Sequence, residues 1–249
     1  MTNGGSNYDC SQGYWQETRR PIVSLAFVVP MLMVYEVGIL MLGPTAMRNG
    51  ADVWLRQLLD AIGFGQYFVL PVLTIATLLA WHHLTRQPWR FSASMLSGMF
   101  LECTACGVIL LAVAQFQGQV MQIIGFSSPL AVVLPENSFG GTRRLVGYFG
   151  AGIYEELLFR LMLLPLITCW LRSVGVSRVV SLICGCVVTS LVFSAAHYNL
   201  FASVGESFDW FSFSFRFLAG IFFAMLFVHR GFGIAAGTHT TYDIFVAFF

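Results

Sequence analysis

The chain has 249 residues, of which 57% are hydrophobic and only 10% are charged, and its formal net charge is +1. Soluble domains carry about 25% charged residues, so this composition does not supply a water-facing surface. The small net charge also argues against a polyanionic ligand, and we expect no nucleic-acid partner. Apolar stretches of near 20 residues recur, and each is long enough to cross a bilayer as a helix. The sequence therefore predicts a multi-pass integral membrane protein.

In chain order, the first predicted element is a polar, mobile tail over residues 1–20. The apolar run after it contains Pro30 and Glu36 and lacks a small-residue cleavage site, so we interpret it as a retained helix rather than a signal peptide. The sequence predicts seven membrane helices, over residues 22–42, 64–84, 94–116, 153–171, 179–198, 213–229 and 232–249.

Two further segments affect the number of spans. Residues 119–135 are apolar but are interrupted by glycine, serine and proline, so they form either a re-entrant or interfacial segment or an eighth span. Residues 144–152 are expected to form a short amphipathic approach to the fourth span. The predicted fold is an all-α polytopic membrane bundle of 7–8 transmembrane helices. Its regions are a tail (1–20), an N-terminal transmembrane region with the interfacial segment (21–143) and a C-terminal core (144–249).

The strongest set of ionisable residues within the apolar runs of the last hundred residues is Glu155, Glu156, Arg160, His197, His239 and Asp243. Charged groups inside a bilayer are costly and usually face a bundle interior or a water-filled cavity, so they mark candidate functional sites. A purely structural polar network that joins the helices is the alternative interpretation.

Helical geometry gives the two glutamates different environments. Glu156 and Arg160 lie four residues apart and can form an ion pair on one helix face. Glu155 points about 100° away, has no local cation, and is free to meet groups from other helices. His239 and Asp243 also share a helix face. A carboxylate, two histidines and a polar neighbour around one cavity can deprotonate water and stabilise an oxyanion, which is sufficient for peptide hydrolysis without a covalent nucleophile.

At these residues the sequence resembles the CPBP (CAAX protease and bacteriocin-processing, or Abi) family of intramembrane glutamic proteases, which is related to the Rce1-like prenyl-protein endopeptidases. The family motif E-E-x-x-x-R matches Glu155, Glu156 and Arg160. The motif F-x-x-x-H matches Phe193 and His197, and H-x-x-x-N is approximated by His239 and Asp243. The resemblance extends over residues 144–249 and implies that this region is the catalytic core, with the active site inside the bundle.

The resemblance implies an endopeptidase that cleaves a membrane-associated or lipidated peptide or protein, as in CAAX-type processing. Glu155 and His197 would activate water, His239 and residue 243 would form the oxyanion site, and Glu156, Arg160 and Phe193 would support it. No cofactor or catalytic metal is implied. Multi-pass location in a bacterial inner or plasma membrane is expected, with the lipid bilayer and the substrate as partners.

One position departs from the family motif, because Asp243 stands where asparagine is usual. An asparagine amide can donate a hydrogen bond to an oxyanion, whereas an ionised aspartate can only accept one. Asp243 is then protonated, or it orients His239, or activity is weakened; we favour the second interpretation.

Two alternatives to a glutamic protease are a non-catalytic membrane scaffold of the same fold and a zinc-dependent membrane protease, because Glu, His and Asp also ligate zinc. The motif H-E-x-x-H is absent from the sequence. Glu36 and Glu102 also lie in apolar runs, but no surrounding motif indicates their roles.

Overall fold

The computed structural model describes residues 13–43, 46, 48–125, 141–198 and 206–248. In this part of the chain the regular structure is helical, which confirms the all-α prediction. After helical residues 13–17, the elements are α2 (Pro21–Leu42), α3 (Gly50–Ala61), α4 (Val69–Leu84), α5 (Ser94–Ile123), α6 (Gly141–Gly150), the π-helical segments η2 (Ala151–Glu155) and η3 (Leu157–Leu163), α7 (Leu164–Ser173), α8 (Arg178–Ala195), α9 (Trp210–Arg230) and α10 (Phe232–Phe248).

Local sequence signals set several helix boundaries. Asn49, Ser177 and Asp209 are the N-caps of α3, α8 and α9, and each side chain accepts a hydrogen bond from a backbone N–H of the first turn. Gly231 alone separates α9 from α10, with a φ of 90° that glycine adopts without strain. A side chain at Gly231 would also press on the backbone of Arg19. This glycine therefore makes the tight corner that begins α10.

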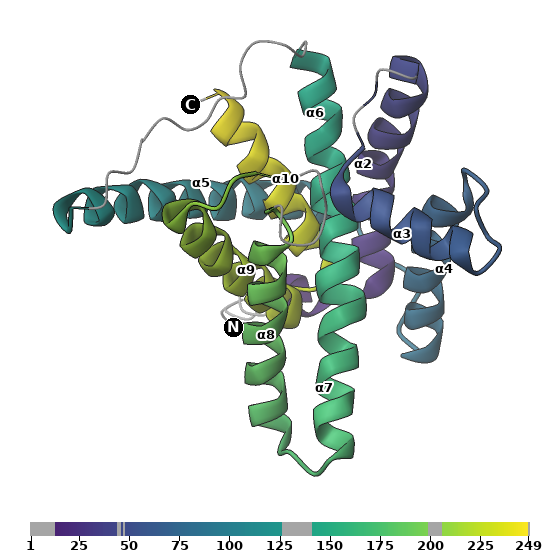
Figure 1. The fold of residues 1–249 in the computed structure, drawn as a ribbon. Helices are drawn as coiled ribbons and strands as arrows, with labels where there is room; N and C mark the ends of the chain where they lie inside the picture. The colour runs from purple at the N-terminus through teal and green to yellow at the C-terminus, as the bar shows by residue number, and fades with distance from the viewer. Residues whose placement is uncertain (1–12, 44–45, 47, 126–140, 199–205, 249) are drawn as a thin grey trace, which may run out of the picture.

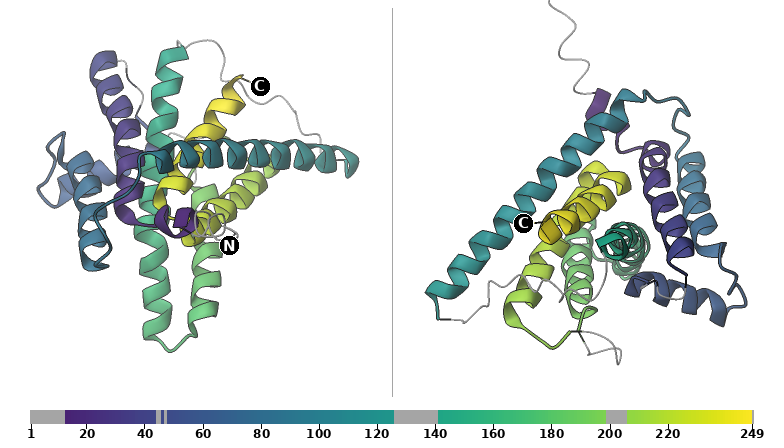
Figure 2. Two further views of the ribbon diagram at one scale, coloured as in Figure 1. Left: turned by 180° about the vertical axis from the view of Figure 1, so that it is seen from behind. Right: turned by 90° about the horizontal axis from the view of Figure 1, so that it is seen from above.

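One long helix passes through the middle of the molecule. The segments α6, η2, η3 and α7 follow one another without interruption from residue 141 to residue 173 (Figure 1). The right panel of Figure 2 shows this helix nearly end-on, with α2, α3 and α4 on one side and α5, α9 and α10 on the other. Its central part is π-helical over residues 151–155 and 157–163. π-Helical backbone is rare and is frequently found at functional sites.

The first half of α10 is buried and packs closely against the long helix. Residues 232–240 are all buried, and α10 contacts α2, α5, α9 and η2. Gly152 of η2 lies against the backbone of Ala236 and Thr240, where a Cβ atom would lie 2.7 Å from the Ala236 carbonyl oxygen. Small residues allow membrane helices to approach each other closely. This contact brings the polar residues of α10 next to those of the long helix.

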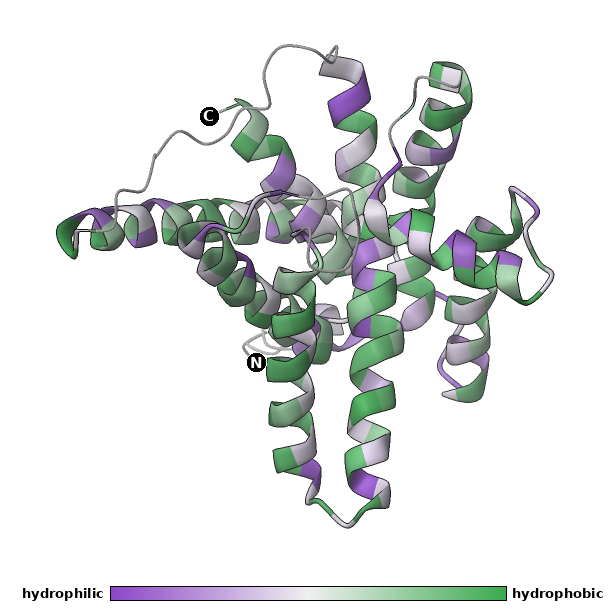
Figure 3. Ribbon diagram, in the orientation of Figure 1, coloured by the Kyte–Doolittle hydropathy of each residue, from purple (hydrophilic) through white to green (hydrophobic). Residues whose placement is uncertain are grey.

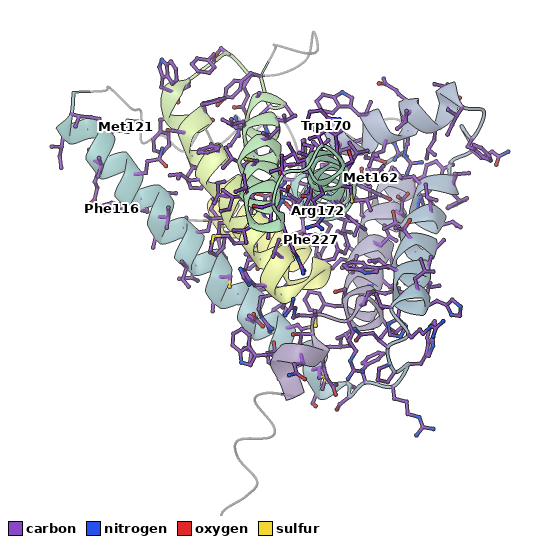
Figure 4. The ribbon with its side chains drawn as sticks, turned by 90° about the horizontal axis from the view of Figure 1, so that it is seen from below. Phe116, Met121, Met162, Trp170, Arg172 and Phe227 are labelled. Atoms are coloured by element: carbon purple, nitrogen blue, oxygen red, sulfur yellow. The ribbon has the colours of Figure 1, made fainter. Side chains whose placement is uncertain are left out.

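The outer surface of the bundle is apolar. Within the described ranges, four helices, α2, α5, α8 and α9, are long and apolar enough to cross a membrane. Phe116 of α5 is 66% exposed, and Figure 4 shows Phe116 and Met121 projecting from this helix. Hydrophobic residues also follow α7 and α8, with hydrophilic residues at the turn between them (Figure 3). We conclude that the chain is an integral membrane protein, while the total of 7–8 spans stays a prediction.

Several helix boundaries differ from the sequence prediction. The helix expected over residues 94–116 continues to Ile123, so the start of the apolar segment 119–135 belongs to α5, and residues 126–135 lie outside the described part of the chain. The approach segment 144–152 and the span 153–171 are parts of one helix. No helix is predicted at α3, a polar helix that carries four charged residues in its neighbourhood: Arg48, Asp52, Arg56 and Asp60.

Residues 13–20 of the predicted tail contact the rest of the bundle, and residues 13–17 are helical. The Tyr14 hydroxyl donates a hydrogen bond to Glu102 Oε2 at 2.7 Å, and Arg230 Nη1 donates to the Trp15 carbonyl at 2.9 Å. Thr18 is fully buried. These contacts join residues that are 88 and 215 positions apart in the sequence. The local polar composition therefore does not reveal them. Residues 1–12 lie outside the described part of the chain.

Candidate active site

Three segments bring the four predicted catalytic side chains together. Glu155 ends η2, His197 follows the C-terminus of α8, and α10 carries His239 and Asp243. Glu155 Oε2 lies 3.7 Å from His197 Nε2 and 3.8 Å from His239 Nε2. His239 Nε2 also lies 3.8 Å from Asp243 Oδ2. These separations are longer than direct hydrogen bonds and suit a small polar group that bridges the side chains.

The two adjacent glutamates contact the same imidazole at different nitrogens. Glu156 Oε1 lies 2.9 Å from His239 Nδ1, whereas Glu155 faces His239 Nε2. The predicted ion pair between Glu156 and Arg160 is present, with 3.3 Å between Glu156 Oε2 and Arg160 Nε. Glu156 therefore bridges Arg160 and His239. Glu155 remains available to the groups on α8 and α10.

Arg160 anchors this bridge in the interior of the bundle. The side chains of Arg160 and Glu156 are both 0% exposed. Arg160 Nη2 donates a hydrogen bond to the Gly220 carbonyl of α9 at 3.0 Å, and its guanidinium lies 4.5 Å from the centre of the Phe193 ring. Buried charges are tolerated when they are paired and hydrogen-bonded. The bridge therefore fixes the edge of His239 that faces away from Glu155.

A hydrogen bond to the backbone fixes the tautomer of His197. His197 Nδ1 lies 2.8 Å from the Phe193 carbonyl oxygen. A carbonyl oxygen can only accept, so Nδ1 carries the proton and, in the neutral ring, Nε2 is a proton acceptor. The Phe193 ring packs edge-on against both His197 and His239, at centroid distances of 5.0 and 5.9 Å. Phe193 thus positions both imidazoles, as its place in the motif suggests.

The exposure of the side chains indicates where the site can be reached. His197 is 26% exposed and Asp243 is 21% exposed, whereas His239 is 6% and Glu155 is 9% exposed. The accessible edge is therefore formed by His197 and Asp243. A surface hollow of about 350 Å³ lies elsewhere, lined by Ile39, Leu40, Gly43, Ala46, Arg48 and Tyr67.

Comparison with known families places this geometry in context. Residues 142–245 match the family model described as type II CAAX prenyl endopeptidase Rce1-like. Over these residues, which are less than half of the chain, the protein is similar to the Rce1-like family. The matched region contains all seven residues that the sequence motifs single out. Comparisons with curated proteins and with solved structures gave no match.

Asn49, which lies outside the matched residues, contacts Glu155, and the motifs do not predict this contact. Asn49 Nδ2 donates a hydrogen bond of 2.7 Å to Glu155 Oε1. The only sequence signal at Asn49 is its position as an N-cap, immediately before the polar helix α3. That signal predicts a helix start and does not predict a contact with a residue 106 positions later.

The position of Asp243 bears on its two possible roles in the Rce1-like site. Its Oδ2 atom faces His239 Nε2 at 3.8 Å, which is beyond a direct hydrogen bond. The direct contact that orients His239 is made by Glu156 at Nδ1. Asp243 therefore lies on the same side of the imidazole as Glu155, next to the groups predicted to react.

The zinc alternative requires a set of ligands around one point. Among the residues that the structure describes, no group of three or more His, Cys, Asp or Glu side chains is arranged to hold a metal ion. Metal analysis of the purified protein remains the test of that alternative.

Proposed function

We propose that the chain is an intramembrane glutamic endopeptidase that hydrolyses a peptide bond of a membrane-associated or lipidated peptide or protein. One observation carries this proposal. Glu155 Oε2 is buried, has no hydrogen-bond partner among the described residues, and lies at nearly equal distances from two imidazole Nε2 atoms. A buried carboxylate oxygen that is left without a donor is costly, so a functional reason for it is expected.

In the proposed reaction, Glu155 and His197 activate a water molecule. The water lies between Glu155 Oε2 and His197 Nε2, which both accept protons, and its oxygen attacks the carbonyl carbon of the scissile peptide bond. The proton removed from water goes to the Glu155–His197 pair. A new C–O bond forms as the carbonyl π bond becomes an oxyanion.

The oxyanion is then stabilised by the opposite side of the site. With its Nδ1–H directed at Glu156, a charged His239 donates a hydrogen bond from Nε2 to the oxyanion. Collapse of the tetrahedral intermediate breaks the C–N bond. The leaving nitrogen takes the proton held by the Glu155–His197 pair, so the two groups return to their starting states. This sequence needs no covalent enzyme intermediate.

The substrate is proposed from the family alone. The family description names CAAX prenyl endopeptidases, so a peptide with a lipidated C-terminal segment is the first substrate to test. We place the protein in a bacterial inner or plasma membrane as part of the same proposal. A non-catalytic scaffold is the main alternative, and the Asp at position 243 is the observation that favours it.

The test compares purified wild-type protein with the variants Glu155→Gln and His197→Ala on a lipidated fluorogenic peptide. General acid–base groups contribute roughly 10²- to 10⁴-fold to a rate, so we expect losses of that size for each variant. Glu17→Gln is the matched control, because Glu17 forms an ion pair with Arg20 near the surface and makes the same carboxylate-to-amide change. Wild-type rates in both site variants would refute the mechanism. A wild-type protein that binds the peptide and never cleaves it would favour the scaffold.

A further inference from the structure

The N-terminal region of the chain contributes a polar contact to the candidate site. Asn49 lies outside the matched residues 142–245, yet its amide contacts Glu155 directly. Because of this contact, the two carboxylate oxygens of Glu155 have different partners. Oε1 receives the Asn49 hydrogen bond at 2.7 Å, and Oε2 is turned toward His197 and His239.

The orientation of the Asn49 amide follows from its two contacts. Its Oδ1 accepts a hydrogen bond from the Ala51 backbone N–H at 2.8 Å, so Nδ2 is the atom that faces Glu155. The reverse orientation would set an amide donor against the Ala51 N–H and an oxygen against the Glu155 carboxylate, and both contacts would be repulsive. The N-cap of α3 thus holds the donor in place for Glu155.

An ion-pair network centred on the buried Asp52 keeps α3 against α2. Asp52 is fully buried and accepts hydrogen bonds from Arg48 Nη1 at 2.7 Å, Arg56 Nε at 2.6 Å and the Tyr35 hydroxyl at 2.8 Å. Because Asp52 lies one helical turn from Asn49, these three donors fix the first turn of α3.

The same network reaches the residue that precedes Glu155. Arg56 Nη2 contacts Glu36 Oε1 at 3.2 Å, and the Tyr154 hydroxyl donates to the same Glu36 oxygen at 2.5 Å. Two consecutive residues of the long helix, Tyr154 and Glu155, are therefore both bonded to the N-terminal region. This arrangement gives Glu36 a role that its sequence position does not reveal.

We infer that Asn49 is a positioning residue, which orients Glu155 so that its Oε2 atom faces the two imidazoles. The inference rests on the proposed hydrolytic function of the site. Asn49 acts through Glu155 and is not assigned a contact with substrate. Its loss is expected to lower kcat and to leave KM within about twofold of the wild type, because a rate loss without a binding loss marks an interaction needed for the chemical step.

The decisive variant is Asn49→Asp. Aspartate is as good an N-cap as asparagine, so the bond to the Ala51 N–H is kept. The donor toward Glu155 is replaced by an acceptor, and two carboxylates then face each other. Because a hydrogen bond to a charged group is worth one to two factors of ten, we expect kcat to fall about 10- to 100-fold. Asn49→Ser also keeps the cap but has too short a side chain to reach Glu155, and we expect a fall of about tenfold.

The control variant Asp209→Asn tests whether an Asn/Asp exchange at a helix N-cap alone changes the kinetics. Asp209 is the exposed N-cap of α9, and its side chain accepts a hydrogen bond from the Ser212 N–H at 2.8 Å. Asp209→Asn is the same isosteric exchange at a cap that has no contact with the site, so we expect wild-type kinetics. Thermal unfolding of all variants is measured in the same detergent, and the midpoints of the two Asn49 variants should stay within a few degrees of the wild type.

The outcomes distinguish this inference from the proposed function. If Glu155→Gln is inactive while Asn49→Asp and Asn49→Ser retain wild-type kcat, the inference fails and the function stands. If wild-type protein and Glu155→Gln do not differ, the proposed function fails. If kcat and the unfolding midpoint fall together in both Asn49 variants, Asn49 is only structural and the inference fails. A fall in kcat alone supports it.

Discussion

Two carboxylates in apolar helices differ in how they are hydrogen-bonded: Glu102, whose side chain is 16% exposed, and Glu155, which is buried. Glu102 of α5 is satisfied at both oxygens: Arg230 donates to Oε1 at 2.6 Å and to Oε2 at 2.7 Å, and the Tyr14 hydroxyl also donates to Oε2. Glu155 has a donor at Oε1 only, and its Oε2 faces two imidazoles without a hydrogen bond among the described residues.

This difference in hydrogen bonding indicates a structural role for Glu102 and is consistent with the proposed catalytic role of Glu155. Burial and then the hydrogen bond to Glu102 raise the pKa of Tyr14, so this hydroxyl remains a donor at any physiological pH. The Arg230 guanidinium also lies 3.8 Å from the centre of the Trp15 ring. The Glu102 cluster therefore ties the N-terminal helical residues to α5 and α9, and both Glu102 oxygens accept hydrogen bonds from within the protein. Glu155 retains capacity for an external group.

The largest expected effect comes from exchanging each carboxylate for an amide. Glu155→Gln should lower kcat roughly 10²- to 10⁴-fold, because the general base is lost. Its unfolding midpoint should change little, since the glutamine oxygen still accepts from Asn49. Glu102→Gln should do the reverse, with a loss of about 1.5–3 kcal/mol of stability from the weakened bonds to Arg230. The measurements are kinetics and thermal unfolding of both proteins. A Glu102→Gln protein that loses activity while its stability is unchanged would contradict the structural role of Glu102.

An intermediate effect is expected from separating the long helix and α10. In Gly152→Ala, the new Cβ atom would lie 2.7 Å from the Ala236 carbonyl oxygen and 2.9 Å from the Thr240 nitrogen, so α10 must shift. Such overpacking costs about 1–3 kcal/mol. Displacement of His239 by about 1 Å can lower a rate about 100-fold. Gly147→Ala is the control, because a Cβ atom at Gly147 would have no heavy atom of another residue within 4 Å, apart from its neighbours in the chain and the backbone of its own helix.

The Gly152 pair also shows whether the free oxygen of Glu155 depends on the position of α10. Kinetics and unfolding are measured for both alanine variants. Wild-type kcat in a Gly152→Ala protein that is less stable than Gly147→Ala would mean that the separation between Glu155 and His239 does not limit the rate.

Part of this arrangement can be predicted from the sequence and part cannot. The spacing of Glu156 and Arg160 predicts their ion pair, and the length and apolarity of the helices predict the all-α fold, because both depend on local geometry. The bond between Glu156 and His239 depends on how α10 packs against the long helix. The bond between Asn49 and Glu155 depends on α3, whose polar sequence carries no motif. Contacts of this kind are decided by tertiary packing, which no short pattern encodes.

The smallest effect is expected at Asp243. Its Oδ2 atom lies 3.8 Å from His239 Nε2 and makes no direct hydrogen bond to it, while Glu156 holds the other nitrogen of the ring at 2.9 Å. In Asp243→Asn the side chain keeps its size, loses its charge and gains an Nδ2 donor next to the position proposed for the oxyanion. We therefore expect kcat between the wild-type value and about tenfold above it, because one further donor to an oxyanion can be worth that much. Kinetics on the lipidated peptide check this expectation. A well-folded Asp243→Asn protein with no activity would show that the aspartate carboxylate itself is needed, and would move Asp243 from the oxyanion side of the site to the acid–base pair.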